Sequence, residues 1–386
     1  MSVREYLSPD KVSEALKNWL REPDEPDRVY PKNKKIEVVF LVEAVNAILP
    51  RTEGVEDITL TKLPGTEYEV PTILPEKLQA VTRRRMLAQL RRYRDEKPEN
   101  LKQYLKTLAN LFEYTKGGKS KSKNEKVVIR FKKAEVYSGN PKDWNCYIQP
   151  PGGDATDVGM DGFCPACTLF GTVITNNVLE FYDTKKDKNI FGESVGIKSR
   201  VEFDPAVAFV DQEKSVADYT HNKVADGASW TGQSLYTEHH VAPGTLFVGK
   251  VTLEDVTEVE LKAFLAVLAT IDRLGGRERV YGGVRIHLIG IRGGSYETVS
   301  ALEIARLLAK EYGEVEYPPA VEVVKEKVWN TIQNYGFQRI ESKDFKKLMD
   351  NMNLWDNLWD DTVKYDKRIV ERILRLIRGG NFEPLE

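Results

Sequence analysis

The order of predicted strands and helices constrains this fold more than any other feature of the sequence. Residues 35–45 are β-branched and apolar and predict a central strand, and residues 76–94 predict a helix that follows a proline. Residues 245–253 again predict a strand, a Thr-x-x-Glu capping box at 257–260 opens an amphipathic helix, and an alternating strand follows at 284–288. Without the segments between them, these elements form the ferredoxin-like split βαβ plan of an α+β protein.

The segments between these elements predict large insertions in that plan. RNA-recognition domains use the same plan as an open sheet, with single-stranded RNA against one face. We expect a discontinuous RRM-like core formed by residues 30–137, 172–203 and 243–297. The parts outside the core are a zinc-binding insertion at 138–171, a thumb-like or lid-like excursion at 204–242 and a helical C-terminal part at 298–386.

Basic residues are concentrated in one part of the chain. Between Lys77 and Lys133 there are 18 Lys or Arg and 5 Asp or Glu, although the net charge of the chain is −2. The plainer interpretation of an Arg-rich helix is a solvated face, but six arginines within twelve residues favour a polyanion. The asymmetry of sign along the chain favours nucleic acid. The candidate RNA contacts in this part are Lys77, Arg83, Arg84, Arg85, Arg91, Arg92, Arg94, Lys119, Lys121 and Lys123.

A glycine-rich loop, residues 275–283, joins the second predicted helix to its strand. Its four glycines allow the backbone to approach a phosphate closely, and Arg277 and Arg279 supply charge. A helix C-cap explains one of the glycines but not the arginines. The loop is neither a P-loop nor a dinucleotide-binding motif, because it follows a helix and precedes a strand.

Three cysteines lie in one Pro/Gly-rich segment with few apolar residues. Cys164 and Cys167 have the C-x-x-C spacing that places two thiolates on one tetrahedral Zn²⁺, and Cys146 lies upstream. Reduced thiols or a redox pair are the alternatives. A structural zinc ion would replace the missing apolar core of the insertion. The fourth ligand is either an acid or one of four histidines, of which we choose His221 because it lies in a polar loop; the other three are His239, His240 and His287.

No sequence motif of a common enzyme class is present, and His239, His240 and Asp57 are the only candidates for acid–base work. No apolar run approaches the ~18 residues of a membrane span, and the first residues lack the apolar part of a signal peptide. We therefore expect a soluble cytoplasmic protein that does not contact a membrane.

Five motifs together resemble a known family. In order along the chain they are Val70-Pro-Thr-Ile-Leu-Pro75-Glu-Lys77 before the basic helix, Cys164-Pro-Ala-Cys167-Thr-Leu-Phe170-Gly171, Ser199-Arg200-Val-Glu-Phe-Asp204, Val241-Ala-Pro243-Gly244-Thr-Leu-Phe247, and the loop from Gly275 to Gly283. The order of these motifs is similar to that in the RAMP-superfamily backbone subunits (the Cas-seven family) of CRISPR interference complexes, most closely those of type I-D. The resemblance covers about residues 35–292.

The resemblance implies a non-catalytic subunit for antiviral defence that binds guide (CRISPR) RNA as repeated copies along it. It also implies contact with the target nucleic acid strand and other subunits of the complex, and it adds Arg200 to the candidate RNA contacts. Base pairing reads the target in such complexes, so binding to phosphates without sequence preference suits the role. Two other hypotheses stay open: a RAMP-superfamily endoribonuclease that processes guide RNA or cleaves target RNA, and a zinc-dependent scaffold that binds only protein.

Overall fold

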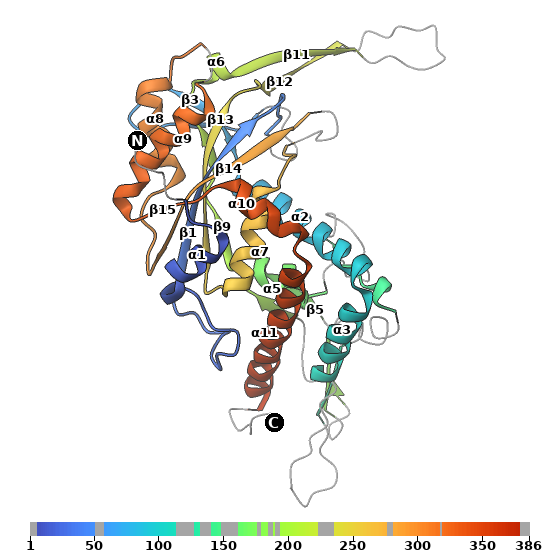
Figure 1. Ribbon diagram of the computed structural model, residues 1–386. Coiled ribbons are helices and arrows are strands. Elements are labelled where there is room, and N and C mark those ends of the chain that lie inside the picture. Colours follow the sequence, from blue (N-terminus) through green and yellow to red (C-terminus); the bar gives the residue numbers. More distant parts are fainter. Residues whose placement is uncertain are drawn as a thin grey trace, which may run out of the picture.

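An eight-stranded antiparallel sheet lies at the centre of the fold (Figure 1). The computed structural model describes residues 6–50, 58–112, 127–131, 140–147, 161–175, 179–183, 188–189, 194–222, 235–275, 281–316 and 319–378. In sheet order the strands are β15 (Gln338–Arg339), β14 (Val284–Gly294), β1 (Lys35–Ala44), β13 (Leu246–Glu254), β10 (Ala206–Ala208), β3 (Glu69–Ile73) and β2 (Leu60–Lys62), with β9 (Val201–Phe203) also paired to β13.

At the centre of the sheet, two parallel strands lie on either side of β1 and are joined by a crossover connection. Strand β1 is antiparallel to both of its neighbours, so that Val38 faces Val251 of β13 on one side and Ile291 of β14 on the other. Strands β13 and β14 therefore run in the same direction, and helix α7 (Glu258–Ala269) joins them across β1. The predicted α+β class is confirmed, and the capping box of α7 is present, with hydrogen bonds of 3.3 and 2.9 Å between Thr257 and Glu260.

Helices cover both faces of this sheet. Figure 1 shows α8 (Ala301–Tyr312) and α9 (Val321–Ile332) on one face and α7 with α2 (Pro75–Glu96) on the other. Strand β1 is buried over almost its whole length, and so is β13. Both faces of this sheet are thus covered by helices, whereas an RNA-recognition domain leaves one face open.

The remaining helices extend this body. Helix α2 matches the basic helix predicted at 76–94, and the C-terminal part is helical, as expected. The other described helices are α1 (Pro9–Ala15), α3 (Pro98–Phe112), α5 (Pro165–Phe170), α6 (Gln212–Ser215), α10 (Ser342–Lys346) and α11 (Met352–Arg378), with short 3₁₀ helices at Lys17–Trp19, Pro141–Asp143, Gln333–Tyr335 and Lys347–Asp350. Long helix α11 packs against α3, α5 and α7.

Three small sheets lie outside the central one. The first is the hairpin of β11 (Val216–Asn222) and β12 (Leu235–Val241), which projects from the body at the top of Figure 1. The main chain of Val241 exchanges hydrogen bonds with that of Ile48, which fixes the base of the hairpin to the segment after β1. The other two sheets are β4 (Val127–Phe131), β6 (Leu179–Asp183) and β7 (Lys188–Asn189), and the pair β5 (Thr172–Thr175) and β8 (Ser194–Ile197).

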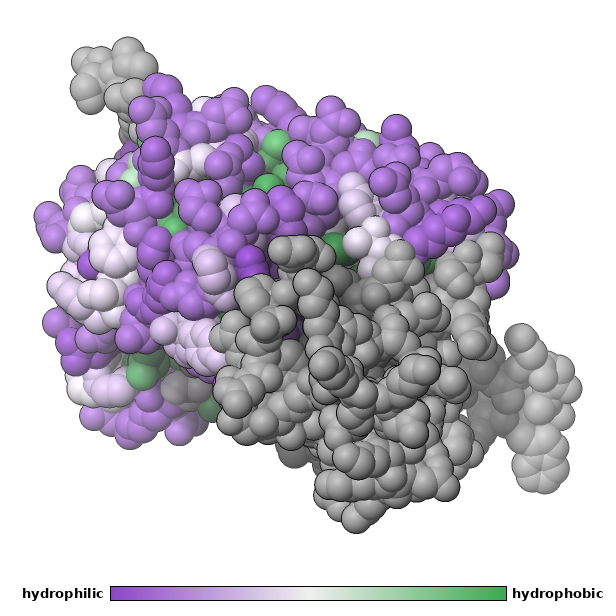
Figure 2. Space-filling view, turned by 90° about the horizontal axis from the view of Figure 1, so that it is seen from below, coloured by the Kyte–Doolittle hydropathy of each residue, from purple (hydrophilic) through white to green (hydrophobic). Residues whose placement is uncertain are grey.

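One face of the molecule is largely polar where the structure describes it. Figure 2 shows hydrophilic residues over most of the described part of the face seen from below, with apolar residues only in small separate spots. Among the described helices, none combines the length and the apolar character needed to cross a bilayer.

Candidate functional site

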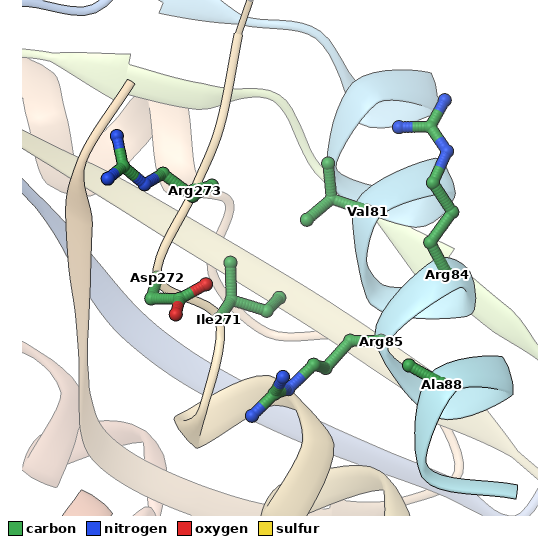
Figure 3. A pocket seen from close by; sticks show the side chains of 7 residues that line it. All are labelled: Val81, Arg84, Arg85, Ala88, Ile271, Asp272 and Arg273. Carbon is green, nitrogen blue, oxygen red and sulfur yellow. The ribbon is translucent and has the colours of Figure 1, made fainter. Parts of the chain in front are cut away.

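A cationic groove lies between helix α2 and the segment that follows helix α7. Its volume is about 440 Å³. Figure 3 shows the two walls of the groove: successive turns of α2 form one wall, and residues 271–273 form the other. The lining residues are Val81, Arg84, Arg85, Ala88, Ile271, Asp272 and Arg273.

Helical spacing explains the first wall. Val81, Arg84, Arg85 and Ala88 have the i, i+3, i+4, i+7 spacing of one helix face, while the core side of α2 is formed by residues such as Leu78 and Met86. Lys77 lies one turn before Val81 and continues the same face. Part of the basic helix thus turns its charge toward one surface.

Hydrogen bonds to the start of β14 fix the second wall. Leu274 donates its N–H to Gly282 at 2.8 Å, and Val284 donates to the carbonyl of Asp272 at 3.0 Å. Gly275 has a φ of +102°, and a Cβ there would lie 2.9 Å from the carbonyl oxygen of Leu49, so this position requires glycine. Arg273 lies two residues before the glycine-rich loop, whose Arg277 and Arg279 lie outside the described residues.

The side chains of the groove carry three cations and one carboxylate. Arg84 is exposed, and no hydrogen bond or ion pair joins it to the described part of the chain. Arg85 donates from Nε to the hydroxyl of Thr270 at 3.4 Å, and Arg273 donates from Nη1 to the carbonyl of Tyr281 at 3.2 Å. The hydroxyl that Arg85 contacts is not an anion, so the charges of Arg84 and Arg85 remain available to an anionic ligand.

Three other arginines of α2 bind the cysteine-containing segments instead. Arg83 is buried and donates to the Sγ of Cys167 at 3.3 Å and to the carbonyl of Gly171 at 2.9 Å. Arg91 donates to the carbonyl of Cys146 at 2.6 Å, and Arg94 to that of Trp144 at 2.9 Å. The sequence grouped all three with the candidate RNA contacts; in the structure their hydrogen bonds attach the cysteine-containing segments to the helix.

Two further candidate RNA contacts are also paired within the protein. Arg92 is exposed and forms ion pairs with Glu96 and Asp350, both at 2.7 Å. Arg200 is buried, with Glu260 2.8 Å from its Nη1 and the ring of Tyr365 4.5 Å from its guanidinium carbon. Arg200 differs most from its sequence expectation: its buried ion pair joins the segment before β9 to α7, and its contact with Tyr365 joins that segment to α11.

The three cysteines meet at a buried cluster, as the sequence predicted. The Sγ atoms of Cys146 and Cys167 are 3.5 Å apart. A ligand atom from each of Cys146, Asp161, Cys164 and Cys167 lies within 4.8 Å of every other. Two thiolates on one tetrahedral zinc ion, each at ~2.3 Å, are about 3.8 Å apart, so the donor set fits Zn²⁺ in spacing and chemistry.

Local structure explains how Asp161 joins the cluster. One oxygen of its carboxylate accepts hydrogen bonds from the main-chain N–H groups of Phe163 and Cys164, both at 3.0 Å, and the other accepts from the indole of Trp144 at 2.8 Å. The carboxylate thereby holds the turn that leads into α5, where Cys164 is the N-cap. The sequence signal for Asp161 is its position three residues before the C-x-x-C pair. From the sequence, acids are a class of possible fourth ligand, but Asp161 is not singled out.

The histidine chosen from sequence lies elsewhere. His221 is on β11, paired in register with Tyr236, and its side chain is outside the described residues. Figure 1 shows the hairpin projecting from the top of the molecule, whereas α5 lies lower in the body. The fourth polar group beside the thiols is Asp161.

Electrostatics favour a thiolate at one position of the cluster. Burial alone would raise the pKa of Cys167, but hydrogen bonds from the Cys146 and Cys164 thiols, together with the Arg83 charge, hold that pKa well below its usual range. Burial raises the pKa of Cys164, and it raises the pKa of Asp161 to about 6. Arg83 therefore supplies a permanent positive charge beside the sulfur that ionises first.

The acid–base candidates are separated. His239 is exposed and lies 2.7 Å from the carboxylate of Asp218, while His240 is fully buried between Tyr219 and Tyr281 at ring distances of 4.9 and 4.5 Å. His287 lies 2.7 Å from Glu43 on the central sheet. Asp57 and the lysines of the Lys/Gly/Ser loop, Lys119, Lys121 and Lys123, lie outside the described residues.

Comparisons with known proteins give a consistent family. A family model described as Csc2 Crispr matches residues 15–367. The crystal structure of Thermofilum pendens Csc2 is 34% identical, has a TM-score of 0.67 and covers 94% of this chain and 96% of its own. A CRISPR RNA-guided surveillance complex in a pre-nicking state is 8% identical over 78% of this chain and 87% of its own, with a TM-score of 0.46, which is too remote to carry an argument. No curated protein matches the chain.

Proposed function

This chain belongs to the Csc2 CRISPR family, and from that membership we propose that it is a non-catalytic, guide-RNA-binding backbone subunit of a type I-D interference complex. Its role would be antiviral defence in the cytoplasm. Its partners would be guide RNA, the target strand, further copies of itself along the RNA and other subunits of the complex.

The observation that carries this proposal is the groove between α2 and the segment that follows α7. Arg84 and Arg85 come from the basic helix, and Arg273 comes from a segment almost 190 residues later in the chain. Basic residues from two distant parts of the chain thus line one surface, and the segment that carries Arg273 leads into the glycine-rich loop. Phosphate contacts give affinity without reading sequence, which suits a protein that must accept any guide.

The course of the RNA beyond the groove is part of the same proposal. Lys77 continues the groove face of α2, and Arg277 and Arg279 follow Arg273 in the chain. We assign the thumb role to the excursion at 204–242, which includes the projecting hairpin, so that it reaches over the RNA or onto the next copy.

The division of the chain is also proposed. The order β14-β1-β13-β9, with α7 crossing between β13 and β14, supports an RRM-like core assembled from residues 30–137, 172–203 and 243–297. The insertion at 138–171 would contain the metal site. The part from 298 onward would cover one face of the sheet with α8 and α9 and would pack α10 and α11 against α7 on the other.

We propose that Zn²⁺ is bound by Cys146, Cys164 and Cys167, with Asp161 as the fourth ligand. The ion would be structural and would join the segments that contain the three cysteines. Arg83 would hold the site against α2 through its bonds to Cys167 and Gly171.

Crosslinking tests the RNA path directly. RNAs of unrelated sequence that carry 4-thiouridine should all crosslink to peptides that contain residues 81–88 and 271–275. Unlabelled RNA of any sequence should compete equally, because phosphates are read. Crosslinks confined to the exposed part of α8 and α9 would reject the groove.

An endoribonuclease remains the second candidate because of one observation. His239 and Asp218 form an exposed pair at 2.7 Å on the projecting hairpin, a geometry in which a histidine can exchange protons. Incubation with repeat RNA and with guide-matched RNA decides between the two functions. Cleavage that His239→Ala abolishes would establish the enzyme, and intact RNA supports the backbone subunit.

A further inference from the structure

Asp272 is an exposed carboxylate in the wall of a groove whose other charges are positive. It lies between Ile271 and Arg273, and Figure 3 shows its side chain and that of Arg85 turned into the space between the two walls. In the part of the chain that the structure describes, no hydrogen bond or ion pair joins the Asp272 carboxylate to another side chain. Three arginines line the same groove, and none of them neutralises it.

The main chain holds this carboxylate in place. The carbonyl of Asp272 accepts from the N–H of Val284 at 3.0 Å, and its neighbour Arg273 forms a β-bridge with Gly283. The carboxylate is therefore presented by a segment anchored to the central sheet, and its position does not depend on a partner side chain.

A carboxylate in a phosphate-binding groove has an electrostatic cost. It repels each phosphate that the arginines attract, so on charge alone the groove would bind a nucleic acid better without it. The cost is offset if the ligand offers a hydrogen-bond donor at that point, because a carboxylate is only an acceptor and its hydrogen bonds are strong.

RNA has two kinds of donor within the strand. Phosphate oxygens and sugar ring oxygens only accept, which leaves the N–H groups of the bases and the ribose 2′-hydroxyl. Base N–H groups differ from one nucleotide to the next, so a carboxylate bound to them would read sequence. Carboxylates bind ribose 2′-hydroxyls in nucleotide-binding folds, and this hydroxyl is absent from DNA.

We propose that Asp272 accepts a hydrogen bond from a ribose 2′-hydroxyl and thereby makes the groove selective for RNA over DNA. The inference rests on the proposed function, because it requires RNA phosphates on Arg84, Arg85 and Arg273. In this arrangement the arginines provide affinity for either nucleic acid, and the single carboxylate provides the discrimination.

The experiment compares RNA, DNA of the same sequence and 2′-O-methyl RNA by fluorescence anisotropy in buffer without Mg²⁺. The wild-type protein should prefer RNA, and Asp272→Ala should lower the ratio of RNA to DNA affinity about tenfold, which is the size of one hydrogen bond to a charged group. Affinity for DNA should stay or rise, because the repulsion is gone. Asp272→Asn, which keeps an acceptor, should retain part of the preference.

Two controls make the outcomes distinct. Glu14→Ala removes an exposed carboxylate on α1, outside the groove, and should leave the ratio unchanged. 2′-O-methylation should weaken binding to the wild-type protein more than to Asp272→Ala, a comparison that a folding defect cannot imitate.

An RNA to DNA ratio that Asp272→Ala leaves unchanged overturns the inference, provided that Arg84→Ala weakens both nucleic acids. If Arg84→Ala weakens neither, the groove itself is not the binding site, and the proposed function fails together with the inference. If Asp272→Ala loses the preference for RNA and Arg84→Ala weakens binding to both RNA and DNA, the results support the inference and the proposed function together.

Discussion

The Nη2 of Arg83 lies 3.3 Å from the Sγ of Cys167, although the next residue along α2, Arg84, faces solvent at the cationic groove. Successive residues of a helix point about 100° apart, so one arginine reaches the thiol cluster and the next reaches the groove. The basic helix therefore serves two sites, and substitutions at neighbouring positions should have separable effects.

Arg83→Ala should weaken the metal site and leave RNA binding intact. The change removes the positive charge beside the sulfur of Cys167 and the hydrogen bonds of Arg83 to Cys167 and Gly171, and breaking a buried charge pair costs about 3–5 kcal/mol. Zinc content and thermal unfolding measure the first effect, and anisotropy with single-stranded RNA measures the second. Arg84→Ala should show the reverse pattern. Equal loss of RNA affinity in the two variants would contradict the separation.

The metal site should contain about one zinc ion per chain. Substitutions in the cysteine cluster should release this zinc ion, and substitutions in the hairpin should not. Asp161→Ala removes the group that both approaches the thiols and holds the turn before Cys164, so we expect zinc loss on dialysis. His221→Ala should retain the metal. Elemental analysis of the two purified variants checks this, and zinc that survives Asp161→Ala but not His221→Ala would restore the ligand set chosen from sequence.

The ion pair between Arg200 and Glu260 should contribute to stability in a pH-dependent manner. Burial alone would raise the pKa of Glu260, but Arg200 and Arg28 lower it from 4.5 to about 2. A group with a depressed pKa stabilises the folded state above its unfolded value, so this contribution is present above pH 4.5 and is lost as the pH falls toward 2.

Glu260→Gln should therefore cost about 3–5 kcal/mol at pH 7 and flatten the loss of stability below pH 4.5. Urea unfolding over a pH series measures both. Glu258→Gln is the matched control, because Glu258 lies in the same turn but is paired at the surface with Lys262, where a change of less than about 1 kcal/mol is expected. Equal changes in the free energy of unfolding for the two substitutions would contradict the structural role assigned to Arg200.

The projecting hairpin should matter for assembly more than for contact with one RNA segment. Replacing residues 223–234 by a short Gly/Ser turn keeps both strands of the hairpin and removes what joins them. Short RNA should bind with nearly unchanged affinity, whereas cooperativity on long RNA should disappear. Titration of RNAs of increasing length checks this, and cooperativity that persists would place the contact between copies elsewhere.

Much of the fold was predictable because its elements are long and periodic. The strand predicted at 35–45 is β1, the basic helix predicted at 76–94 is α2, and the capping box at Thr257 opens α7. Local rules also predicted the thiol cluster, since the C-x-x-C spacing and Cys146 lie close in sequence.

The division of labour among the arginines was not predictable from sequence. Composition identifies a basic helix, but only the packing of α5 and the cysteine segments against it separates Arg83, Arg91 and Arg94 from Arg84. The position of Arg273 was not predictable either, because the sequence does not distinguish it from other charged residues. Hydrogen bonds to the start of β14 place it opposite α2. Long-range contacts of this kind leave no local pattern.

The salt dependence of RNA binding tests the central claim most directly. For single strands, log affinity falls with log salt by about 0.7 per neutralised phosphate, so Arg84→Ala with Arg273→Ala should flatten the slope by about 1.4 for every RNA sequence. Arg92→Ala, which removes an exposed arginine already paired with Glu96 and Asp350, should leave the slope unchanged. A slope that the double variant does not change, or that Arg92→Ala changes as much, would contradict the assignment of the groove to RNA.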